Sequence, residues 1–140
     1  MNPSAIAFII VFIWGIWAIF EKKLALTVHP LNGMIYFAVL GFILIPVYYL
    51  IGRAYGVEFT FNKEGILIAT FAQILSAIGG LLFLYLLIMK PSAWAVGITA
   101  AYPIVTMLAG KYLLKEELSF ASIIGIFLVT AGLVVLGMEA

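Results

Sequence analysis

The sequence contains no cysteine, and few of its residues are charged. The absence of cysteine excludes disulfide bonds and thiol chemistry. Only 9% of the 140 residues are Asp, Glu, Lys or Arg, and 66% are hydrophobic, whereas a soluble domain carries about 25% charged residues. Such a chain cannot present a water-facing surface on all sides, so we expect lipid to be its solvent.

Histidine is nearly absent as well, since His29 is the single one and lies beside Pro30 in a connection. Its sequence neighbours are not those of a metal site or a nucleophile relay. We therefore expect no catalytic residues, no metal and no cofactor, and we do not expect an enzyme. The formal net charge of +1 argues against a nucleic-acid partner. Residues 1–20 hold no Lys or Arg, so they are predicted to be a retained first span and not a signal peptide.

What the sequence has in abundance is long apolar runs. A helix that crosses the hydrocarbon core needs about 20 mostly apolar residues, and five windows reach that length. Backbone polar groups in lipid must pair within their own segment, so each window is predicted to be helical. The predicted fold class is all-α, an integral membrane bundle of five transmembrane helices in one domain over residues 1–140. The predicted spans are about 4–23, 31–51, 65–89, 92–113 and 119–138.

The connections between the spans carry most of the Lys and Arg. Because five is odd, the two termini are predicted on opposite sides of the membrane. The side of the N-terminus then receives four basic residues and the other side three: Arg53, Lys63, Lys111 and Lys115 against Lys22, Lys23 and Lys90. Orientation normally follows a clear excess of Lys and Arg toward the cytoplasm. The sequence leaves two alternatives open, insertion in both orientations or one topology fixed by a weak bias.

Charged residues are missing from the interior of the apolar windows. An ionisable residue inside the membrane usually marks a proton relay or an ion site. Glu21, at the end of the first span, is the nearest candidate, and the simpler interpretation is an interfacial carboxylate neutralised by Lys22 or Lys23. The sequence therefore favours facilitated movement of a solute over tight proton coupling.

Aromatic and weakly polar side chains gather on helix faces. The predicted lining of a substrate cavity is Trp14, Trp17, Gln73, Trp94 and Tyr102. Such a wall suits a small, partly apolar solute, although Trp and Tyr are also common at membrane interfaces. Two prolines inside spans, Pro46 and Pro103, each remove a backbone hydrogen bond and are predicted to bend their helices, either for movement or for packing geometry.

Small residues lie along one side of the last span. Ala121, Gly125 and Gly132 allow close approach of a neighbouring helix, which association within lipid requires. Their spacing leaves open whether that neighbour belongs to the same chain or to a second copy.

The whole chain resembles the EamA domain of the drug/metabolite transporter superfamily. The second half is similar to the family's apolar helix with a proline, short turn with a glutamate and glycine-bearing last helix. The matching residues are Trp14-Gly15 with Lys22 or Lys23, Tyr85 through Pro91-Ser92-Ala93, Pro103, Glu116 in KEELS, Gly125 and Gly132. The basic residue that many members carry in the second span is missing here, so recognition of an anion through it is not expected.

The resemblance implies a function as well as a fold. Most members carry two such domains, related as an inverted repeat, with substrate bound at the repeat interface. A single five-helix unit implies an antiparallel homodimer of dual topology that exports or facilitates passage of small organic metabolites by alternating access. Its partners would be membrane lipid, a small-molecule solute and a second copy. The location would be the cell membrane, either plasma membrane or a bacterial or archaeal inner membrane. The alternative is a non-transporting membrane assembly or accessory subunit.

Overall fold

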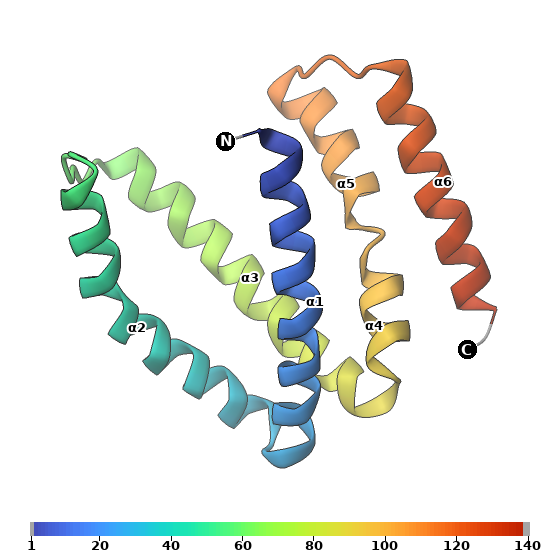
Figure 1. Ribbon diagram of the computed structural model, residues 1–140, viewed down its shortest axis with the longest axis horizontal. Coiled ribbons are helices and arrows are strands. Elements are labelled where there is room, and N and C mark those ends of the chain that lie inside the picture. The colour runs from blue at the N-terminus through green and yellow to red at the C-terminus, as the bar shows by residue number, and fades with distance from the viewer. Residues whose placement is uncertain (1, 139–140) are drawn as a thin grey trace. The chain divides into compact units, whose positions relative to one another are not determined.

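The computed structural model describes residues 2–138, and within them all regular structure is helical. Five helical segments are long and apolar enough to cross a membrane, so the predicted all-α class with five spans is confirmed. In chain order the elements, drawn in Figure 1, are α1 (Pro3–Thr27), α2 (Pro30–Ala54), α3 (Lys63–Met89), α4 (Ser92–Thr99), α5 (Tyr102–Ala109), the π-helical η1 (Gly110–Leu114) and α6 (Phe120–Gly137).

Side chains at the helix starts satisfy backbone N–H groups that have no partner within the helix. The Asn2 carboxamide accepts from the N–H of Ser4 at 3.0 Å, and Pro3 lies in the first turn of α1. The Asn62 side chain accepts from the N–H of Gly65 at 2.6 Å at the start of α3. Polar residues between apolar runs therefore set where the spans begin.

The first helix is longer than predicted, because α1 continues to Thr27 instead of ending at residue 23. Lys22 and Lys23 interrupt the apolar run, but both are good helix formers. The first real obstacle is Pro30, which disfavours helical backbone at the residue before it. His29 accordingly serves as the N-cap of α2, and its Nδ1 accepts from the N–H of Leu31 at 3.3 Å.

The fourth span, predicted as one helix over residues 92–113 with a bend at Pro103, is interrupted. Helix α4 ends at Thr99, and α5 begins at Tyr102 with Pro103 in its first turn. A proline ring collides with the carbonyl of the residue four positions earlier, which here is Thr99. The helix therefore separates into two pieces over Ala100 and Ala101. The second proline, Pro46, lies inside α2, and Figure 1 shows that helix bending along its length.

Packing within the chain falls into two compact units, one ending at Met89 and the other starting at Lys90. In the first unit, the C-terminal ends of α1 and α3 meet near the start of α2 (Figure 1). Leu84 and Leu87 of α3 are fully buried there. In the second unit, α4 and α5 both contact α6.

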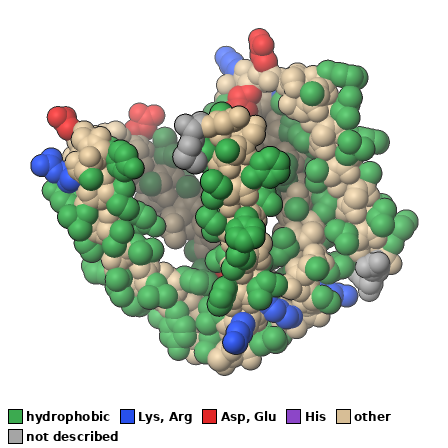
Figure 2. Space-filling view, viewed as in Figure 1, with side chains coloured by type: hydrophobic (Ala, Val, Ile, Leu, Met, Phe, Trp, Pro, Cys, Tyr) green, Lys and Arg blue, Asp and Glu red, His purple; other side chains and the backbone are tan. Residues whose placement is uncertain are grey.

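Most other apolar side chains are exposed, and Figure 2 shows them covering the visible helix surfaces, with charged side chains at helix ends. In the most apolar window of α2, 0% of the residues are buried. Such surfaces are stable only against lipid or another protein.

Candidate functional site

A groove between α2 and α3 in the first unit has a volume of about 870 Å³. Its walls are apolar apart from one side chain, the carboxamide of Gln73. The lining residues are Leu31, Met34, Ile35, Phe37, Ala38, Gly41, Gln73 and Ala77. A wide apolar groove with one amide can hold a partly apolar solute and orient it through a hydrogen bond.

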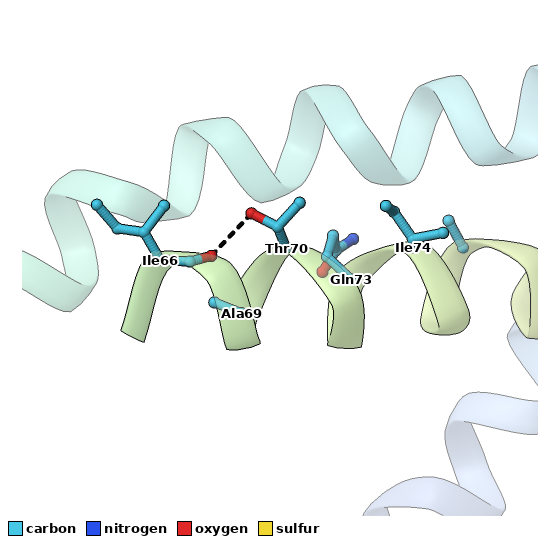
Figure 3. Close-up of a pocket in the computed structure, with 6 residues that line it drawn as sticks. Ile66, Ala69, Thr70, Gln73 and Ile74 are labelled. Carbon is cyan, nitrogen blue, oxygen red and sulfur yellow. Dashed lines mark hydrogen bonds between the residues drawn. The ribbon is translucent and has the colours of Figure 1, made fainter. Parts of the chain in front are cut away.

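A second hollow of about 580 Å³ lies along α3 and shares Gln73 with the groove. Figure 3 shows the side chains that line it following α3, with the hydroxyl of Thr70 directed back to its own helix. That hydroxyl donates to the carbonyl of Ile66 at 2.8 Å, so it is already satisfied. Gln73 is therefore the side chain in both hollows with polar groups to offer a ligand.

The two tryptophans of α1 are placed differently from each other. Trp17 stacks on Phe83 of α3, with ring centroids 6.1 Å apart and planes 8° from parallel. Trp14 is 58% exposed. Neither lines the α2–α3 groove, so their predicted role in a cavity stays a prediction, and the position of Trp17 is that of a packing residue between α1 and α3.

In the second unit, Trp94 joins α4 to α6. Its indole Nε1 donates to the carbonyl of Leu136 at 3.1 Å, and the Lys90 ammonium lies 5.3 Å from the ring centroid. Close approach of the helices depends on Gly97, where a Cβ would lie 2.6 Å from the Leu136 side chain. Tyr102, by contrast, is 59% exposed at the first residue of α5, beside the interruption of the span.

The end of η1 explains why a glutamate follows the fourth span. Lys115 adopts a left-handed conformation with φ of 57°, and the N–H of Glu116 returns to the carbonyl of Gly110 at 3.1 Å. The Glu116 carboxylate lies over Gly110, where a Cβ would stand 2.5 Å from one of its oxygens. Gly110 thus makes room for Glu116 and lets the chain turn toward α6.

The sequence did not predict the contact of Lys22 or the burial of Glu21, two adjacent residues of α1. Lys22 donates a hydrogen bond from Nζ to the carbonyl of Leu87 in the last turn of α3. Glu21 is buried, with only 4% of its surface exposed, whereas the sequence favoured an interfacial carboxylate. Helical spacing was the available signal, because Glu21 is three residues after Ala18 and four before Ala25, the other buried residues of α1.

The small residues predicted as a helix-packing or dimer face remain open within the described chain. A Cβ at Gly125 or Gly132 would meet no atom within 4 Å, and Ala121 is exposed. The face therefore has space for a neighbouring helix.

Comparison with known families shows to which family the chain belongs. The family model described as the EamA-like transporter family matches residues 3–138, nearly the whole sequence. The chain belongs to the EamA-like transporter family. No curated protein and no solved structure matches it.

Membership of the EamA-like transporter family agrees with the five apolar spans. The chain is a multi-pass membrane protein of the drug/metabolite transporter type. Members of the family are transporters and not enzymes, which agrees with the composition of the chain.

Proposed function

We propose that this EamA-like chain moves small organic metabolites across the membrane by alternating access, as an exporter or facilitator. The observation that carries the proposal is the family match over residues 3–138. The groove between α2 and α3 supports it, because it is large enough for a small solute and offers one amide for orientation. The proposed solute is small and partly apolar, in keeping with walls made of aliphatic and aromatic side chains.

The functional unit we propose is an antiparallel homodimer. Three observations support a second copy: the odd number of spans, the near balance of Lys and Arg, and the small amount of buried apolar surface in each span. The open side of α6 at Gly125 and Gly132 offers one surface for contact. Two copies in opposite orientations would form an inverted repeat, with the solute site between them.

Orientation can be fixed by adding lysines to one side of the membrane. One form would carry Val57→Lys and Thr60→Lys in the connection between α2 and α3. The opposite form would carry Thr27→Lys at the end of α1 and Asn32→Lys in the first turn of α2. All four side chains are exposed, and matched controls would carry glutamine at the same positions.

We expect each lysine form alone to lose at least tenfold in transport, because all copies point one way. Coexpression of the two forms should restore transport, and the glutamine controls should retain it. Full transport by either lysine form alone would contradict the antiparallel dimer.

Solute movement itself can be measured as flux into liposomes for a panel of amino acids, amines and sugars. The variants to compare are Gln73→Leu, Trp14→Ala and Tyr102→Ala. We expect Gln73→Leu to change the KM because it removes the amide of the groove. If transport occurs and none of the three substitutions alters it, the cavity assignment is wrong. If the folded protein moves no solute of the panel, the accessory-subunit alternative gains weight.

A further inference from the structure

Glu21 belongs to the buried side of α1, together with Ala18 and Ala25. Its Oε2 is enclosed and has no hydrogen-bond partner. The two alanines let neighbouring helices approach α1 closely, and Glu21 is the only one of the three with a side chain that extends beyond Cβ. The sequence therefore places one carboxyl group on the buried face of α1.

The neighbouring helices offer Oε2 no hydrogen-bond donor. The buried residues of α3 at this end are Leu84 and Leu87, and those of α2 are Pro30 and Gly33. The titratable side chains at this end of the three helices are Lys22, Lys23, His29, Tyr36 and Tyr85.

None of these side chains forms a hydrogen bond with Oε2. Lys22 donates to the carbonyl of Leu87. The ring of His29 lies edge-on to that of Tyr85, with centroids 6.0 Å apart. Lys23 and Tyr36 are exposed. Oε2 therefore has no hydrogen-bond partner, although basic residues are close in sequence.

With the midpoint of α1 at the centre of the bilayer, Glu21 lies within the hydrocarbon core. The 25 residues of α1 span about 37 Å at 1.5 Å per residue. Glu21 is about 9 Å beyond the helix midpoint on the same scale, and half of the hydrocarbon core is about 15 Å. An ionised carboxylate without a partner at that depth costs several kcal/mol, whereas the neutral acid costs far less.

We propose that Glu21 is an exchangeable proton site that couples solute movement to a proton. In the arrangement described here, where Oε2 is enclosed, it carries the proton as a neutral carboxylic acid. When α1 separates from α3, water reaches the group, the O–H bond breaks, and the proton passes to water while the carboxylate keeps the electron pair. The inference that Glu21 couples solute movement to a proton rests on the proposed function. The inference that Glu21 exchanges a proton does not.

Protonation can be measured without knowing the solute. Infrared difference spectra of the protein in lipid, recorded against pH, report the C=O band of a neutral carboxylic acid. We expect a band that titrates in the natural protein, disappears in Glu21→Gln and persists in Glu64→Gln, which removes an exposed carboxylate from the first turn of α3. A spectrum in which Glu21→Gln removes no protonated-carboxyl band would overturn the proposal.

Coupling is tested by solute accumulation in liposomes under a pH gradient with the membrane potential clamped at zero. For one proton per solute, a gradient of one pH unit supports roughly tenfold accumulation. We expect Glu21→Gln to equilibrate the solute but not to accumulate it, Glu21→Asp to recover part of the accumulation, and Glu64→Gln to behave as the natural protein.

The remaining outcomes separate the two proposals. Undiminished accumulation by Glu21→Gln, or loss of downhill equilibration together with accumulation, would overturn the coupling role. Solute flux in the natural protein without any response to the gradient would overturn it too. If no solute moves at all, the proposed transport function fails, and the infrared titration still decides whether Glu21 exchanges a proton.

Discussion

Replacing Lys22 by methionine tests the contact that joins α1 to the end of α3. Leu87 is one of the last four residues of α3, so its carbonyl has no partner within the helix. Leu87 is also fully buried, so water cannot take the place of the lysine. Methionine keeps much of the length and apolar character of the side chain, and it removes the ammonium group that donates to this carbonyl.

The magnitude follows from the kind of hydrogen bond that is lost. Hydrogen bonds with one charged partner contribute about 1.5–3 kcal/mol, and a cation at a helix C-terminus contributes about 0.3–1 kcal/mol. These two figures describe the same ammonium beside the same carbonyl, so they are not added. We expect Lys22→Met to lower the free energy of unfolding by about 2 kcal/mol, which is roughly a 30-fold change in the equilibrium constant.

The measurement is unfolding in mixed detergent micelles of increasing SDS fraction, followed by circular dichroism. Lys23→Met is the matched control, because it removes one basic residue from the same side of the membrane and leaves the Leu87 carbonyl paired. Lys23 is exposed, so we expect the control to change the free energy by less than about 0.5 kcal/mol. Equal losses for the two variants would show that the Lys22 contact does not stabilise the fold.

Three further substitutions test other contacts. Trp94→Phe removes the donor to the Leu136 carbonyl, and we expect a loss of about 1 kcal/mol in the same unfolding assay. Ser119→Ala removes the oxygen that accepts from the N–H of Ser122 at 3.1 Å, and we expect a loss of about 1 kcal/mol. Pro103→Ala should slow amide hydrogen exchange where the span is interrupted, because the ring no longer blocks helical backbone there. We expect this variant to transport more slowly, because a bend point is removed.

Each of these substitutions has a comparison within the chain. Trp14→Phe alters a largely exposed indole, so it should leave unfolding unchanged while Trp94→Phe does not. Thr60→Ala removes a hydroxyl from a connection where it caps no helix, and it serves as the control for Ser119→Ala. A Pro46→Ala variant should leave hydrogen exchange at Ala100 and Ala101 as it was. An equal effect of Pro46→Ala there would contradict the assignment of the interruption to Pro103.

The number of spans and their helical structure could be predicted from the sequence because lipid imposes a simple rule on length and hydropathy. Ser119 stands directly before the last apolar run and caps the last helix, since its hydroxyl accepts from the N–H of Ser122. Both features depend on residues that are neighbours in sequence, where pattern and propensity are informative.

The burial of Glu21 and the partner of Lys22 could not be predicted in the same way. The contact between Lys22 and Leu87 joins residues 65 positions apart. The first predicted span ended at residue 23, although Glu and Lys both continue a helix readily. Gln73 was predicted as a cavity residue, and it lines the α2–α3 groove, yet the apolar walls around it come from a second helix. Only the packing of the helices reveals those walls.

The interruption of the fourth span has a consequence for where water must be. In a continuous helix the carbonyl of Thr99 would accept from the N–H of the residue four positions later, but that residue is Pro103, which has no N–H to donate. A carbonyl left in hydrocarbon without a donor costs several kcal/mol, so irregular backbone at membrane depth faces protein or a hydrated cavity and not lipid. The backbone at Ala100 and Ala101 must therefore be in contact with water whenever the protein is in the bilayer. Otherwise a polar group of a partner or solute must cover it.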